Sequence, residues 1–227
     1  MAAWLLAALL AAAPADPAAD LREARAQALR ALGDPAAAEQ AWLASLRAAE
    51  RALRVLAPAW AEAVDRGEDP AQAVRRVEAP GAEALYRMAL AAMGLARQRG
   101  FAAVLAASPV ALPAMERAAA LAPGIDEAGP WRAIGAWTAV LPSAGGGGAG
   151  RSRAAFAEAR RLAPGCLRAR VEEAETLAVL LQDKALFRRL LAEVLAPGAG
   201  GTPPTPEDEL ARRRARELLA RQESLIP

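Results

Sequence analysis

Alanine is the feature that most constrains the fold of this chain, because it fills 66 of the 227 positions. Alanine has the highest helix propensity, and leucine, arginine and glutamate, which are also common here, lose little side-chain freedom in a helix. The aromatic residues that favour strands make up only 4% of the chain. With 55% hydrophobic and 24% charged residues, the composition is that of a folded protein with a core, not of a disordered or multi-span membrane chain. It predicts an all-α protein.

The missing residue types exclude several classes of function. The chain has no histidine, which rules out a Ser-His-Asp or Cys-His catalytic centre and any histidine-ligated metal site. Its single cysteine, Cys166, allows neither an internal disulfide nor a multi-cysteine metal centre, and we interpret it as a small buried residue. The net charge of only +2 gives no case for nucleic-acid binding. We expect no metal and no cofactor.

Residues 1–15 have the layout of a cleavable export signal. The run MAAWLLAALLAAA carries no charged side chain, is too short to span a bilayer, and leads into the small-x-small sequence Ala13-Pro14-Ala15. This predicts a periplasmic protein whose mature chain begins at Asp16, without a lipid-acceptor cysteine after the apolar run. The alternative is an N-terminal helix retained in the mature protein, and only a retained segment would bring membrane contact.

Beyond the export signal, we expect residues 16–227 to form a single domain of short helices separated by Pro and Gly. The spacing predicts helices over 82–99 and 184–195, and two separate helical segments over 101–107 and 111–121. Residues 197–206, PGAGGTPPTP, have the composition of a linker before a C-terminal helix. The arginines of that last helix are interpreted as a solvated face.

An internal repeat indicates how the helices are arranged. The segment MERAAALAPG, which begins at Met115, returns 41 residues later as FAEARRLAPG, which begins at Phe156. Upstream of the second copy, the W-x-x-I-G pattern at Trp131 resembles the tetratricopeptide signature, with Gly135 as a helix-packing glycine. Helical hairpins of this kind bury their apolar faces only by stacking. We therefore predict a tetratricopeptide-like stack of antiparallel helical hairpins, the alternative being an unrelated helical array that converges on Leu-Ala-Pro-Gly.

An ordered series of motifs within residues 84–197 resembles a known family. The series is ALYRMALAAMGLA, MERAAALAPG, GPWRAIGAWTAVLP, SRAAFAEARRLAPG and LQDKALFRRLLAEVLAP. It is similar to the T-component of TRAP transporters (tripartite ATP-independent periplasmic transporters), whose members are tetratricopeptide-like. The chain departs from the family pattern at Gly148, where relatives tend to carry an acidic residue. The resemblance implies an accessory periplasmic protein that associates with the transporter's solute-binding subunit and is not an enzyme.

The candidate binding residues lie mainly in one helix and the glycine turn after it. They are Trp131, Arg132, Trp137, Leu141 and Pro142, because a guanidinium beside two indoles offers a carboxylate fork next to apolar area. The tryptophans are six residues apart and cannot share one helix face. We expect Trp131 to be the packing residue and Trp137 the freer one, in a groove for the solute-binding partner or its apolar or carboxylate ligand. The alternative is that both are core anchors.

A second candidate pair and two other classes of function stay open. Gln182 and Asp183 are candidate binding residues, although Asp183 also fits the N-cap of the following helix. For an enzyme, the best carboxylates are Glu172, Glu173 and Glu175 with Asp183, but nothing positions a nucleophile, metal or phosphate beside them. The other alternative is a generic helical-repeat adaptor in envelope assembly. Formation of a homo-oligomer is left open.

Overall fold

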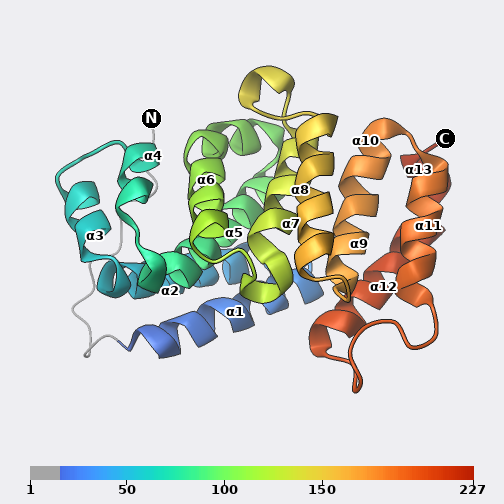
Figure 1. Cartoon of the computed structure of the whole chain (residues 1–227), viewed down its shortest axis with the longest axis horizontal. Helices are drawn as coiled ribbons and strands as arrows, with labels where there is room; N and C mark the ends of the chain where they lie inside the picture. Colours follow the sequence, from blue (N-terminus) through green and yellow to red (C-terminus); the bar gives the residue numbers. More distant parts are fainter. Residues whose placement is uncertain (1–15) are drawn as a thin grey trace.

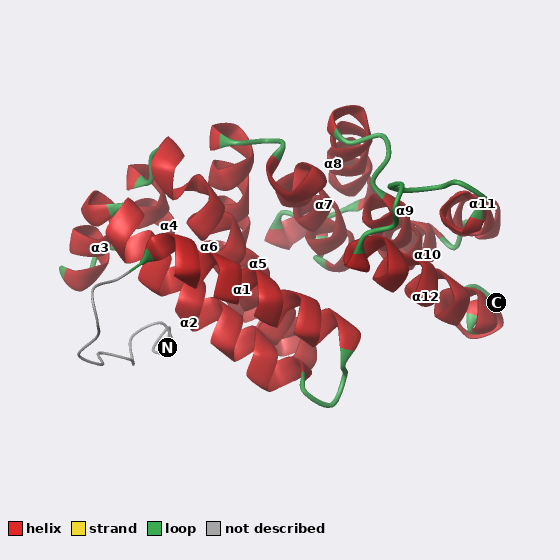
Figure 2. Cartoon of the chain, turned by 90° about the horizontal axis from the view of Figure 1, so that it is seen from below, coloured by secondary structure: helices red, strands yellow, loops and turns green. Residues whose placement is uncertain are grey.

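The computed structural model describes residues 16–227, and this part of the chain is all-α without a strand, as predicted (Figure 2). The expected export signal at residues 1–15 lies outside the described residues. The α-helices are α1 (Pro17–Gly33), α2 (Ala38–Leu56), α3 (Pro58–Asp65), α4 (Pro70–Ala73), α5 (Ala82–Arg99), α6 (Phe101–Leu121), α7 (Ile125–Val140), α8 (Ala149–Leu162), α9 (Leu167–Glu173), α10 (Val179–Leu181), α11 (Lys184–Leu195), α12 (Pro206–Ala220) and α13 (Gln222–Leu225). Three short 3-10 turns (Val74–Arg76, Ala79–Gly81 and Ser143–Gly145) and a π-helical turn (Ala174–Ala178) complete the secondary structure.

Successive long helices pack side by side through most of the chain (Figure 1). α1 packs on α2, α2 on α5, α5 on α6, and α7 on both α6 and α8. The last helices form a second group, in which α9, α11 and α12 contact one another. In Figure 1, α1 runs along the lower side of the array, and it reaches from α2 to α12. The tetratricopeptide-like assignment of this array stays a prediction.

The Leu-Ala-Pro motif ends a helix in both copies of the repeat. α6 ends at Leu121 and α8 at Leu162, and the alanine that follows each has a non-helical conformation, with φ of −151° and −136°. Proline clashes with a helical residue before it, so this alanine leaves the helical region and the chain turns. In both copies the first residue, Met115 or Phe156, is fully buried. The repeat is therefore a repeat of local structure as well as of sequence.

Close contacts between helices explain the small residues of the motifs. A Cβ atom on Gly135 of α7 would lie 2.8 Å from the ring of Phe156 on α8, so only glycine lets these two helices approach. This confirms Gly135 as a helix-packing residue. The expectation of two separate helical segments over 101–107 and 111–121 is wrong, because α6 continues through Pro109 and Pro113. By length and apolar composition α6 could cross a membrane, but half of its apolar window is buried in the fold, as in a core helix.

The apolar side chains form two clusters, and the boundary between them positions the candidate site. The first cluster is built by α1 to α8 with the short turns between them, and the second by α9 to α13. The two groups meet where α7 contacts α9 and where α1 contacts α12. Charged side chains gather at this junction, between two apolar cores.

Candidate functional site

The structure reverses the roles expected for the two tryptophans of α7. Trp137 is 2% exposed, and its indole N–H donates a hydrogen bond of 3.0 Å to the hydroxyl of Ser108 on α6. Trp131 is only partly buried against the first cluster, and its indole nitrogen has no acceptor among the described residues. The expectation that Trp137 is the freer one is therefore wrong, because the face of α7 that carries it packs on α6.

The glycine turn after α7 is packed against the helix end. Leu141 is buried, whereas Pro142 is exposed at the start of the turn that projects from the array in Figure 1. The amide of Gly148 donates a hydrogen bond of 2.8 Å to the carbonyl of Thr138, which closes the turn. Gly147 lies so close to the Leu141 carbonyl that a Cβ atom would collide with it. This close approach explains why position 147 is a glycine.

Gln182 and Asp183 have local structural partners. The Asp183 carboxylate accepts a hydrogen bond of 2.8 Å from the amide of Leu186 and caps α11, which is the alternative that the sequence left open. Gln182 has a left-handed backbone, with φ of 53°, and its amide group donates to the carbonyls of Val179 at 2.9 Å and Leu225 at 3.2 Å. These contacts connect the end of α10 with α11 and α13.

The three glutamates considered for acid–base chemistry are all held by arginines. The pairs are Glu172–Arg132, Glu173–Arg160 and Glu175–Arg214. Each of these carboxylates is therefore engaged in an ion pair within the fold. In residues 16–227, moreover, side chains do not gather into a group that could hold a metal ion.

Of the predicted site residues, Arg132 is the one that belongs to a cluster of buried charged side chains. It is 2% exposed and donates to the main-chain carbonyls of Asp126 at 2.9 Å and Glu127 at 3.2 Å. Its third partner is the Glu172 carboxylate on α9, at 2.8 Å. Arg132 therefore connects the start of α7 with α9 across the junction of the two clusters.

The backbone that Arg132 holds has an unusual conformation. Asp126, Glu127 and Ala128 all have left-handed dihedral angles, with φ of 52°, 55° and 59°. For residues other than glycine this region costs roughly 1–2 kcal/mol per residue, and a run of three such residues is rare. Such backbone persists where surrounding contacts overdetermine it, and it is concentrated at functional sites. The turn directs the side chain of Asp126 into the junction.

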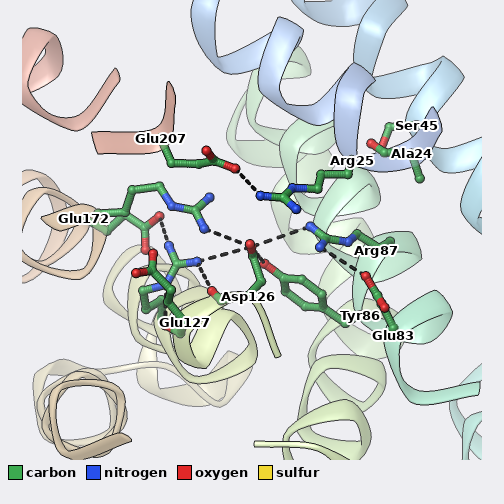
Figure 3. Close-up of polar contacts among 12 residues, drawn as sticks. Ala24, Arg25, Ser45, Glu83, Tyr86, Arg87, Asp126, Glu127, Glu172 and Glu207 are labelled. Atoms are coloured by element: carbon green, nitrogen blue, oxygen red, sulfur yellow. Dashed lines mark hydrogen bonds and ion pairs between the residues drawn. The ribbon is translucent and has the colours of Figure 1, made fainter. Parts of the chain in front are cut away.

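Asp126 is the centre of a buried ionic cluster (Figure 3). The hydroxyl of Tyr86 donates a hydrogen bond of 2.6 Å to its Oδ2 atom. The guanidinium groups of Arg168, Arg132 and Arg87 lie 3.0, 3.4 and 3.5 Å from the same oxygen. One carboxylate oxygen therefore faces a phenol and three arginines that come from α5, α7 and α9.

The electrostatics of the cluster favour an ionised Asp126. Burial alone would raise the pKa of Asp126, but Arg168, Arg132 and Arg87 outweigh it and lower the pKa from 3.8 to about 2. Burial, followed by the charge of Asp126, raises the pKa of Tyr86 far above its usual value of 10. Near neutral pH the pair is therefore a neutral phenol that donates to an anion.

A cleft of about 450 Å³ opens beside this cluster, and we call it the Asp126 cleft. Its lining residues come from α1, α5, α7, α9 and the start of α12, and they are Arg25, Glu83, Arg87, Ile125, Asp126, Glu127, Arg168, Thr205 and Glu207. The volume lies in the range of ligand pockets in proteins, roughly 300–1,000 Å³. The first and the last long helices meet at this cleft.

Two arginines of the cleft have donors that remain unused. Arg87 is 5% exposed, and its Nε–H has no acceptor among the described residues. The Nε–H of Arg168 also has no acceptor among the described residues. At the rim, Arg25 pairs with Glu207 at 2.6 Å and joins α1 to α12, as Figure 3 shows. A buried guanidinium normally fills its donors, so these two unused N–H groups are exceptions that call for an explanation.

Sequence reasoning missed most of this cluster. Arg132 was selected, but Asp126, Arg87 and Arg168 were not, because each is one of many charged residues in its helix. One signal was present: Tyr86, the single tyrosine of the chain, precedes Arg87 in an otherwise apolar helical stretch. A polar pair on the buried face of a core helix needs partners, and that requirement points to a site.

The comparisons with known proteins agree with the motif series. The sequence matches the TRAP transporter T-component family over residues 7–226, which is nearly the whole chain. No curated protein matches it. The chain therefore belongs to the TRAP transporter T-component family and is an accessory component of a TRAP transporter.

Proposed function

We propose that the protein works in the periplasm, where it binds the solute-binding subunit of its TRAP transporter and holds a carboxylate group of the solute in the Asp126 cleft. Family membership supports the place in the transporter. The Asp126 cleft supports the ligand, and the observation that carries this part is that Arg87 and Arg168, which line the cleft, each have a buried Nε–H without an acceptor among the described residues.

Arginine suits this role because its planar group presents donors in a fork that matches a carboxylate. The Asp126 carboxylate already contacts the guanidinium groups of Arg87, Arg132 and Arg168 and keeps them oriented. A second carboxylate that enters the cleft would meet the guanidinium groups of Arg87 and Arg168, which belong to its lining. Preorganised donors of this kind cost little entropy on binding.

The exposed glycine turn is the surface we assign to the solute-binding subunit. Pro142, Ser143 and Ala144 are exposed, and the turn projects beyond the neighbouring helix ends (Figure 1). The hydrogen bond between Gly148 and Thr138 holds the base of the turn. A projecting turn with a fixed base can enter a concave partner surface without the cost of ordering a loose loop.

A calorimetric titration with the solute-binding protein of the same transporter tests the partner. Ala144→Arg places a long cation on the turn, and we expect it to weaken binding at least tenfold. Ala220→Arg is the matched control, because Ala220 is an exposed alanine at the end of α12. Equal affinity for wild type and Ala144→Arg would remove the turn from the interface. A wild type that does not bind the solute-binding protein would contradict the proposed function.

A further inference from the structure

The charges that line the Asp126 cleft are unequal in number. It is lined by three guanidinium groups, those of Arg25, Arg87 and Arg168, and by four carboxylates, those of Glu83, Asp126, Glu127 and Glu207. Charge alone therefore gives the lining no preference for an anion. A ligand that brings only negative charge would add to an existing excess of carboxylates.

The pairing of these groups shows which carboxylate is left over. Arg25 pairs with Glu207, Arg87 with Glu83 and Asp126, and Arg168 with Asp126. Among residues 16–227, no cationic group lies within 4.0 Å of the Glu127 carboxylate, and Glu127 is exposed at the cleft. The cleft therefore presents an acceptor without a partner as well as the unused donors of Arg87 and Arg168.

We propose that the ligand of the Asp126 cleft is a zwitterion, an α-amino acid with an aliphatic side chain. Its carboxylate faces Arg87 and Arg168, and its ammonium group faces Glu127. Such a ligand fills both kinds of unused group and leaves the charge balance of the cleft unchanged. This inference rests on the proposed function, because it specifies the solute that the same cleft would hold.

The apolar neighbours of the cleft explain the aliphatic side chain. Ile125 belongs to the lining, and an adjoining small pocket that shares Arg87 and Arg168 is also lined by Leu29, Leu32, Leu90 and Ala28. The adjoining pocket, at about 10 Å³, is too small for a carbon chain, so the side chain of the amino acid would lie in the cleft against Ile125. Burial of its apolar surface there favours binding.

Calorimetric titration of the full chain with three matched probes tests the charge pattern. The probes are leucine, 4-methylpentanoate, which is leucine without its amino group, and 3-methylbutylamine, which is leucine without its carboxylate. We expect leucine to bind at least tenfold more tightly than either analogue. Equal binding of 4-methylpentanoate would overturn the zwitterion and leave the carboxylate ligand of the proposed function. Equal binding of the amine, or no binding of leucine, valine or methionine, would also overturn it.

Two variants assign the charges to residues. Glu127→Gln should weaken leucine binding at least tenfold and leave 4-methylpentanoate unaffected, whereas Arg168→Gln should weaken both. Glu209→Gln is the control, because Glu209 is an exposed glutamate of α12 outside the cleft lining. If Glu127→Gln binds leucine like wild type, the assignment of the ammonium site is wrong. Binding of the solute-binding protein, measured in parallel without an amino acid, shows whether the partner function survives independently.

Discussion

The two ends of α7 are only one helix length apart, yet different forces hold them. At the carboxyl end, Trp137 and Leu141 are buried in the first apolar cluster, and the glycine turn closes over them. At the amino end, Asp126 and two neighbours are held in left-handed backbone by Arg132 and by the charged groups of the junction. The carboxyl end is a packing element with an exposed turn, whereas the amino end forms the wall of a cleft.

The difference shows why aromatic residues were misleading as markers of the site. A tryptophan has much apolar surface, and burial in a helical stack stabilises it without any functional requirement. An ionic cluster between two apolar cores has no such benefit, because the desolvation of the charges offsets much of their attraction. Its presence in this fold therefore calls for a functional explanation more than the buried indole does.

The largest expected effect is at the carboxyl end. Trp137→Ala removes a fully packed indole and leaves the Ser108 hydroxyl without its donor, so we expect a loss of about 3–5 kcal/mol in the free energy of unfolding. Urea denaturation measures this loss. Trp131→Ala is the comparison, and it should cost less because Trp131 is only partly buried. Equal losses for the two variants would contradict the reversed roles.

At the amino end, Arg132→Gln should cost about 3 kcal/mol, because it removes the cation that holds the carbonyls of the left-handed turn, one of the three cations at Asp126, and the partner of Glu172. The denaturation midpoint measures this change. Arg161→Gln removes an arginine from an exposed pair on α8 and should leave the midpoint unchanged. A wild-type midpoint for Arg132→Gln would show that the turn is stable without this arginine.

The charge of Asp126 should make the amino end sensitive to acid. Because its pKa falls from 3.8 to about 2 on folding, the stabilisation is fully present above pH 4 and is lost as the pH falls toward 2. The lowered pKa corresponds to roughly 2 kcal/mol. We expect the difference in unfolding free energy between wild type and Asp126→Asn to shrink by this amount between pH 4.5 and pH 2. A difference that does not change with pH would contradict the lowered pKa.

The smallest expected effect separates two glycines of the same turn. Gly147→Ala brings a Cβ atom against the Leu141 carbonyl, a backbone group that cannot turn aside, and should cost about 1–3 kcal/mol. Gly145→Ala meets its nearest atom, on Pro142, at 3.6 Å and should be neutral. Thermal unfolding of both variants distinguishes them. Similar melting temperatures would indicate that the turn is looser than its contacts suggest.

The local structure of this protein follows from its amino-acid sequence. Alanine content predicted the all-α class, and helix periodicity with Pro and Gly breaks predicted α5 over 82–99 and α11 over 184–195. The Leu-Ala-Pro endings and the packing role of Gly135 were also readable from the chain. These features depend on backbone propensity and on neighbours a few residues away, so a short window of sequence contains their causes.

Which charged residues form a site depends on long-range packing. Tyr86, Asp126 and Arg168 lie 40 or more residues apart in the sequence, and they meet because α5, α7 and α9 converge where the two apolar clusters adjoin. Apart from the Tyr86-Arg87 pair, nothing in the local sequence distinguishes the charged residues of the cluster from those on solvated faces. Local sequence also did not show which tryptophan faces α6, because the rotation of α7 in the array depends on all its neighbours at once. Long-range packing selects among side chains that are locally equivalent, and for that reason the cleft became visible only in the folded chain.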